Sequence, residues 1–164
     1  MPEYVEKIRV AVKLCMSGQE PMGGQLSLSP SAQFHAGPET LLERLNAHDR
    51  VIPFHRSEDD AVLLVSRIDI DWVAPGRGVD AELVCPRTYI VTREERVRVC
   101  LQGGEEIDGL LRMELPEMLN RASDFLNAAD DFFPIATKKG VCLVNKLRVS
   151  STRVYESSPA PLTS

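Results

Sequence analysis

The sequence lacks the cysteine spacing of a metal site or a disulfide framework. Its four cysteines, Cys15, Cys85, Cys100 and Cys142, lie far apart and form no CxxC pair. Zinc knuckles place cysteines close together in sequence, and small disulfide-stabilised domains have a dense cysteine framework. We therefore expect neither, and interpret the four residues as reduced, mostly buried small hydrophobic side chains.

Long apolar segments are also missing. No run of about eighteen apolar residues, the length that a membrane-spanning helix needs, occurs in the chain. The first residues, MPEYVEKIRVAV, carry acidic side chains early and lack the apolar stretch of a secretion signal. We therefore expect a cytoplasmic protein that makes no membrane contact.

Neither sign of charge dominates the chain. It has 19 Lys and Arg residues against 24 Asp and Glu residues, a net charge of -5. Affinity for phosphate backbones comes from clustered Lys and Arg, so this balance argues against a protein whose main task is to bind nucleic acid, although it does not exclude a local basic strip. With 43% hydrophobic residues, the 164-residue chain has enough apolar surface for one ordinary domain or two small ones.

One segment of the sequence occurs twice. Residues 45–54, LNAHDRVIPF, align with residues 126–135, LNAADDFFPI, with five of ten positions identical and three more exchanging apolar residues. Two further matches fall in the same order: residues 24–28 with 109–113, and residues 65–70 with 144–149. The period of about eighty residues is too long for a solenoid, so the pattern indicates duplication of a small domain.

Local patterns give both copies a common plan of a hairpin, a helix and two or three further strands. In the second copy, VRVCL and IDGLLRMEL alternate apolar and polar residues around QGGEE, which predicts a hairpin. Apolar residues at helical spacing then predict a helix over residues 115–129, with Pro116 and Glu117 in its first turn. The shorter helix of the first copy, PETLLERLNA, has Pro38 and Glu39 in those roles.

The repeated segment predicts a corner between the helix and the next strand. Its Asn can adopt the left-handed conformation that ends a helix, its Asp can close the turn, and its Pro restricts the following strand to a sheet edge or a strand start. A paired ligand site at the two corners is the alternative interpretation. The corner residues are Asn46, Asp49 and Pro53 in the first copy and Asn127, Asp130 and Pro134 in the second.

These patterns divide the chain into four parts. The first β-rich repeat covers residues 1–75, a connection covers 76–93, the second repeat covers 94–156 and a tail covers 157–164. The connection begins with Pro and Gly, and its TYIVT segment has the β-branched character of a strand that can pair with one of the sheets. The tail, SSPAPLTS, has no apolar period, and we expect it to be disordered.

The sequence shows a resemblance that covers most of residues 7–73 and 94–156. Its GxLxL-type strand, SDFLN helix, FFPI corner and VNKLRV strand are together similar to a small β-rich bacterial domain of unknown function, here in two tandem copies. The second copy is more similar, because the first has LERLN and VSRIDI at the matching places. The order of elements also resembles small Sm-like and SH3-like barrels, an analogy of fold that carries no function. The resemblance implies no catalytic or binding residues.

Candidates for catalysis or metal binding are few. The glycines of residues 75–78 lack the Lys-Ser or Lys-Thr of a phosphate loop. His35, His48 and His55 lie near acidic residues but lack ligand spacing on a defined element. The carboxylate pairs beside predicted turns are interpreted as solvated charges. We therefore expect no enzyme, no cofactor and no metal site.

The second copy carries a basic strip. Lys146 and Arg148 share one face of a predicted strand, because alternate residues of a strand point the same way. The preceding turn adds two lysines, and one arginine follows. The strip can contact RNA or an acidic protein, and a solvated strand whose charges deter aggregation is the structural alternative. The strip consists of Lys138, Lys139, Lys146, Arg148 and Arg153.

Together these features predict an α+β, mostly β protein in which two β-β-α-β-β(-β) units pack face to face as a pseudo-dimer. We expect a monomer with pseudo-twofold repeats or a weak homo-oligomer, and we expect Trp72 to pack between the units. The functional prediction is a non-enzymatic protein-interaction or regulatory module with an unidentified protein partner. A nucleic-acid-binding module that uses the basic strand of the second repeat is the alternative.

Overall fold

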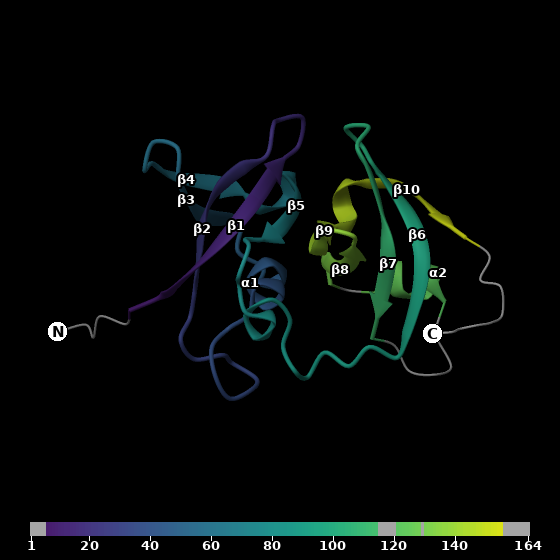
Figure 1. The fold of residues 1–164 in the computed structure, drawn as a ribbon, viewed down its shortest axis with the longest axis horizontal. Helices are drawn as coiled ribbons and strands as arrows, with labels where there is room; N and C mark the ends of the chain where they lie inside the picture. The colour runs from purple at the N-terminus through teal and green to yellow at the C-terminus, as the bar shows by residue number, and fades with distance from the viewer. Residues whose placement is uncertain (1–5, 115–120, 129, 156–164) are drawn as a thin grey trace.

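The computed structural model describes residues 6–114, 121–128 and 130–155. The described residues up to Pro75 form five strands, one α-helix and one 3₁₀ helix (Figure 1). In chain order they are β1 (Ile8–Met16), β2 (Met22–Leu28), α1 (Leu41–Asn46), β3 (Val51–Arg56), β4 (Val62–Ser66), η1 (Arg67–Asp69) and β5 (Ile70–Pro75). We call this part the first half.

The same succession of elements follows from Arg93 onward, in what we call the second half. It consists of β6 (Arg93–Leu101), β7 (Glu106–Met113), α2 (Ala122–Leu126), β8 (Phe132–Thr137), β9 (Gly140–Asn145), η4 (Lys146–Arg148) and β10 (Val149–Val154). Between the halves the chain forms the 3₁₀ helix η2 (Ala81–Leu83). Residues 88–92 form no strand, so the strand predicted within the connection is wrong.

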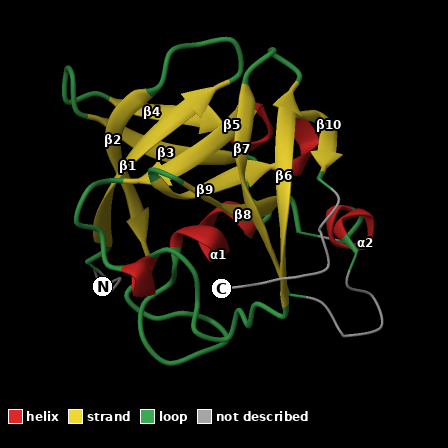
Figure 2. Ribbon diagram, turned by 45° about the vertical axis from the view of Figure 1, so that its right-hand side comes forward, coloured by secondary structure: helices red, strands yellow, loops and turns green. Residues whose placement is uncertain are grey.

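All ten strands belong to one antiparallel sheet, in the order β10-β6-β7-β8-β9-β5-β1-β2-β3-β4 (Figure 2). The predicted mostly β architecture is therefore confirmed. Strands β4 and β10 lie at the two ends of this order, so the sheet is open, and the closed small barrels of the sequence analogy are not confirmed. Among the described residues, no helix is long and apolar enough to cross a bilayer.

The two halves meet edge to edge. Strand β5 pairs with β9 at Trp72 opposite Val144 and at Val73 opposite Leu143. This arrangement differs from the predicted face-to-face packing, because backbone groups at the edge of one half pair with those of the other and extend a single sheet. Trp72 lies in the resulting seam, as the sequence predicts.

Two hydrophobic cores share the strands at the seam. Ile70 and Val73 of β5 face the core of the first half, whereas Trp72, between them, faces the core of the second. In β8 the neighbours Phe132 and Phe133 divide in the same way. Trp72 and Val73, like Phe132 and Phe133, are successive residues of a strand and point to opposite faces, so the seam strands contribute to both cores.

The helices are shorter than the sequence predicts. Helix α1 begins after the N-cap Thr40, whose side chain and that of Glu43 form a capping box. Pro38 and Glu39 therefore precede the helix instead of forming its first turn. Helix α2 covers only Ala122–Leu126 among the described residues, and the predicted first-turn residues 116 and 117 lie outside them.

The predicted left-handed helix ends are wrong. Asn127 adopts a right-handed conformation as the C-cap of α2, and Asn46 is the last residue of α1. Among the described non-glycine residues only Asp60 has a positive φ, at 60°. Helix α1 leaves through an extended C-cap, Ala47, whose N–H still bonds the carbonyl of Glu43, so the chain turns without a left-handed residue.

Candidate functional site

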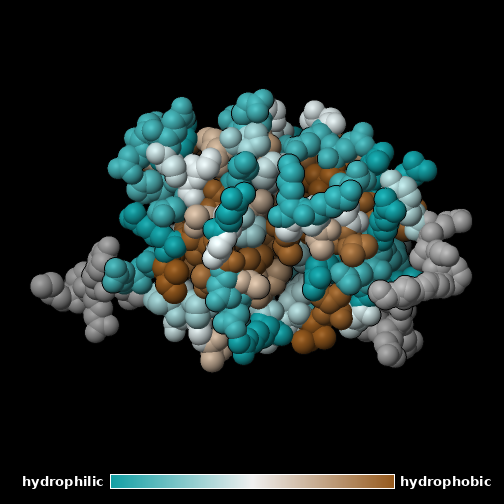
Figure 3. Space-filling model, in the orientation of Figure 1, coloured by the Kyte–Doolittle hydropathy of each residue, from teal (hydrophilic) through white to brown (hydrophobic). Residues whose placement is uncertain are grey.

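A broad groove of about 1870 Å³ lies between the two halves. One side is formed by β5 and the connection that follows it, and the other by β6, β7, β8 and β9. In Figure 3 apolar residues gather in the middle of one face of the molecule, with hydrophilic residues around them. The groove is the candidate functional site because it is a large hollow surface to which both halves contribute.

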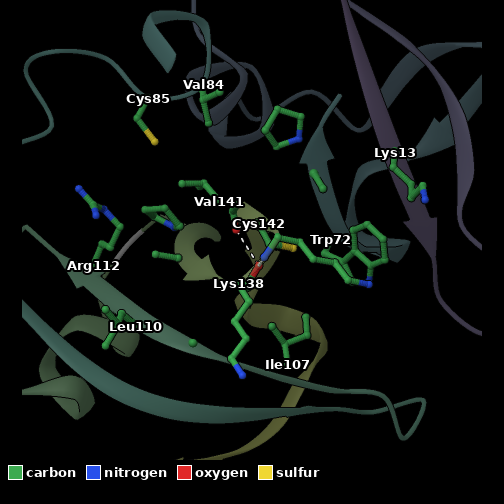
Figure 4. A pocket seen from close by; sticks show the side chains of 18 of the residues that line it. Lys13, Trp72, Val84, Cys85, Ile107, Leu110, Arg112, Lys138, Val141 and Cys142 are labelled. Carbon is green, nitrogen blue, oxygen red and sulfur yellow. Dashed lines mark hydrogen bonds between the residues drawn. The ribbon is translucent and has the colours of Figure 1, made fainter. Parts of the chain in front are cut away.

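The lining of the groove is largely apolar. Trp72 from β5, Ile107 and Leu110 from β7, and Val141 and Cys142 from β9 all contribute to it (Figure 4). Leu110 is 40% exposed, so part of this apolar surface faces solvent. Burial raises the pKa of the Cys142 thiol to about 12, so this sulfur is protonated at neutral pH.

The groove also contains part of a strand edge. Strand β9 pairs with β8 from Gly140 to Asn145 but with β5 only at Leu143 and Val144. Its first residues, Gly140 to Cys142, have no strand partner on the β5 side within the described chain. All three line the groove, so backbone groups of this edge face the hollow and not another strand.

Seven basic side chains and three acidic ones line the groove. Some are already paired: Arg98 Nε lies 2.8 Å from Asp108 Oδ1, and Arg112 bonds Glu94 at 3.2 Å. The bond from Arg98 holds the pKa of Asp108 below its usual value. The seven basic residues are Lys13, Arg77, Arg96, Arg98, Arg112, Lys138 and Lys139, and the acidic ones are Glu105, Glu106 and Asp108.

The structure does not bring the predicted basic strip together as one surface. Lys138 and Lys139 occupy the turn between β8 and β9 and line the groove, and neither has an ion-pair partner among the described residues. Arg153 lies on β10, with its guanidinium 5.1 Å from the centre of the Tyr155 ring. Only the two lysines therefore belong to the site.

Lys146 and Arg148 lie on the 3₁₀ helix η4, not on the predicted strand. Lys146 Nζ donates to the carbonyl of Phe125 at 2.9 Å and lies 4.8 Å from the centre of its ring. Burial lowers the pKa of this ammonium group. Arg148 Nη2 donates to Ser17 Oγ at 2.6 Å. Both cations stabilise the fold at the helix end and at the seam, so they are poor candidates for a partner-binding surface.

The corner residues also have structural contacts. Asn46 accepts from the backbone N–H of Phe132 at 2.7 Å and donates to its carbonyl at 3.1 Å, which joins the two halves. Asp49 pairs with Arg44 at 2.6 Å, and Asp130 is exposed before β8. The neighbouring Asp131 instead forms an ion pair with the buried Arg67 of the first half.

The two corner prolines lie in interior strands, not at a sheet edge. Pro53 is opposite Leu64 of β4, and Pro134 is opposite Leu143 of β9. On the other side of each strand the ladder covers only residues 54–56 of β3 and 135–136 of β8. Each proline precedes the residues of this second ladder, so no ladder hydrogen bond is lost through its missing N–H.

Sequence reasoning identified two of the groove residues, Lys138 and Lys139, but not the groove itself. Its lining comes from distant segments, such as Trp72 and Leu110, which only the seam brings together. The sequence contained one local signal of this surface: Leu110 is apolar at a position where the alternation of its strand requires a polar residue. The chain matches no family model, no curated protein and no solved structure.

Proposed function

We propose that this protein is a non-enzymatic interaction module that binds an extended, acidic segment of a partner protein in the groove between its halves. The observation that carries the proposal is the edge of β9 from Gly140 to Cys142. In the described part of the chain this edge has no strand partner on the β5 side, and it lies in the groove beside two lysines that have no ion-pair partner there. An extended peptide can add to such an edge through main-chain hydrogen bonds.

The lining suggests which peptide side chains fit. Apolar residues such as Leu110 and Val141 favour aliphatic or aromatic side chains, since these lose water on binding. Lys138 and Lys139 favour carboxylates near the β8–β9 turn. The ligand class is therefore a peptide that alternates apolar and acidic residues.

We further propose that the two halves are tandem copies of one unit. Both have the strand order in which the last strand pairs beside the first, β5-β1-β2-β3-β4 and β10-β6-β7-β8-β9. The 3₁₀ helices η1 and η4 occupy the same place in each half. Arg67 Nε donates to the carbonyl of Leu45 at the end of α1, as Lys146 Nζ does to Phe125 near the end of α2. The shared strand order extends beyond the segments that match in sequence, whereas both 3₁₀ helices lie within the matching segments 65–70 and 144–149.

Selection from a random displayed peptide library tests the binding proposal with the full chain as bait. We expect enriched peptides to alternate apolar and acidic residues. Leu110→Asp should weaken the binding of a selected peptide by about tenfold or more, a loss of about 1.4 kcal/mol in binding free energy, because it places a carboxylate in the apolar lining. Leu64→Asp is the matched control, since Leu64 is 72% exposed on β4 and lies outside the groove lining. Equal binding by both variants would contradict the proposal.

Nucleic acid is the second candidate ligand, because seven basic side chains line the groove. A fluorescent single-stranded RNA, titrated at increasing salt, distinguishes it from the peptide. RNA binding that falls with salt and is lost in Lys138→Ala/Lys139→Ala would favour this alternative. Lys146→Ala is the comparison variant and should leave RNA binding unchanged, since its ammonium group bonds the backbone of α2 and lies outside the groove lining.

A further inference from the structure

We propose that Cys15, Asp71 and Glu105 form a binding site for a divalent transition-metal ion of the zinc class at the seam between the halves. One ligand atom from each residue lies within 4.8 Å of the other two. The residues come from β1, from β5 and from the turn between β6 and β7, so the seam alone assembles the cluster. This proposal does not rest on peptide binding, although Glu105 also lines the groove.

A buried carboxylate oxygen without a hydrogen bond points to a missing ligand. Asp71 is only 3% exposed, and its Oδ1 has no hydrogen-bond partner within the described chain. Oδ1 forms only an ion pair, with Arg148 Nε at 3.5 Å, and within the described chain that nitrogen has no hydrogen-bond partner either. A buried carboxylate usually has directed partners. A metal ion would provide one for Asp71.

The cluster has room and access for an ion. A cavity of about 330 Å³ is lined by the three candidate ligands together with Gly18, Gln19, Glu20 and Gly103. The β1–β2 and β6–β7 turns lie at the same end of the molecule in Figure 1, and a Cβ on Gly103 would lie 4.0 Å from the backbone nitrogen of Gly18. The cavity can also hold the water that completes a tetrahedral set.

The ligand types select the class of ion. A thiolate favours zinc and similar transition metals over calcium and magnesium, which prefer oxygen ligands. In a tetrahedral site, bond lengths of about 2.0–2.3 Å place neighbouring ligand atoms roughly 3.5 Å apart. Glu105 is exposed, so its side chain can close the remaining distance without disturbing a core.

The charges of the cluster favour a cation. With Cys15 as thiolate, the three ligands and the neighbouring Glu20 carry four negative charges, and the guanidinium of Arg148 offsets one of them. A divalent cation neutralises two of the remaining three. Without an ion, burial and the nearby carboxylates raise the pKa of Cys15 to about 11, so ion binding must release the thiol proton to solvent as the metal–sulfur bond forms.

Titration of the full chain with Co²⁺ and Zn²⁺ tests the site. In the wild type we expect one equivalent of Co²⁺ to produce a thiolate-to-cobalt charge-transfer band, which equimolar Zn²⁺ displaces and excess Mg²⁺ does not. Zn²⁺ should also change the fluorescence of Trp72, the only tryptophan, whose Nε1 donates to Glu105 Oε1 at 3.0 Å. A wild type without the band, or with a band that survives Cys15→Ser, overturns the proposal.

Matched variants separate this site from other metal binding. Cys85→Ser should keep the band, because Cys85 lies outside the cluster. Asp71→Asn and Glu105→Gln should each weaken Zn²⁺ binding by at least about tenfold. Their near-identical shape preserves packing, so they decide the result if circular dichroism shows that Cys15→Ser does not fold. Unchanged affinity in both folded variants overturns the proposal as well.

Discussion

Asn46 and Asn127 occupy matching places in sequence but make different contacts. The Asn46 side chain forms two hydrogen bonds with the backbone of Phe132 across the seam. Asn127 is exposed, and no hydrogen bond of its side chain occurs within the described chain. One copy of the repeated residue therefore connects the halves, whereas the other serves only its own helix end.

This difference predicts the outcome of a pair of matched substitutions. Asn46→Ala leaves the backbone N–H of the buried Phe132 without its partner and should lower the free energy of unfolding by about 1–3 kcal/mol. Asn127→Ala should change it by less than about 0.5 kcal/mol, because it removes an exposed side chain. Urea unfolding of the two variants measures both values. An equal loss in both would show that Asn46 acts only at its helix end.

At the scale of elements, two glycines allow neighbouring strands of the sheet to approach each other closely. A Cβ on Gly24 of β2 would collide with the carbonyl of His55 and the ring of Phe54 in β3. A Cβ on Gly109 of β7 would lie 2.5 Å from the carbonyl of Ala136 in β8. Each half therefore needs glycine where its second strand begins to pair with its third.

Gly24→Ala and Gly109→Ala should each destabilise the protein by about 1–3 kcal/mol, since the added methyl group forces neighbouring backbones apart. Gly23→Ala is the control in the same strand as Gly24, because its added Cβ would have no described atom within 4 Å apart from those of its chain neighbours. We expect its effect to stay within about 0.5 kcal/mol. Thermal unfolding followed by circular dichroism compares the three variants. If Gly23→Ala lost as much stability as the other two, close strand contact would not be the reason for the glycines.

At the scale of the whole molecule, the shared seam couples the two halves. Phe132 of the second half is buried in the core of the first, and Trp72 of the first is buried in the core of the second. The ion pair between Arg67 and Asp131 also crosses the seam. Neither core is complete without the other half.

The chain should therefore unfold in one cooperative transition. Urea curves from Trp72 fluorescence and from far-ultraviolet circular dichroism should coincide. Phe132→Ala should shift both curves together, with a loss of about 3–5 kcal/mol. Two separate transitions, or a shift confined to one signal, would mean that the halves fold independently.

The sequence by itself determined the mostly β composition, both hairpins and the matching positions of the repeated corner. These features follow from local alternation, turn residues and internal similarity, which need no knowledge of distant contacts. It also singled out Lys138 and Lys139, because a charged turn is visible locally.

Only the tertiary structure decided how the halves join and what each polar residue does. Alternation predicts that Lys146 lies on a strand, but it lies on η4 and donates a hydrogen bond to the end of α2. Cys15, Asp71 and Glu105 are scattered in sequence and approach one another only at the seam. The pairing of β5 with β9 creates both the groove and this cluster. Neither could be predicted from the sequence, because hydrogen bonds between distant strands leave no periodic signal in the chain.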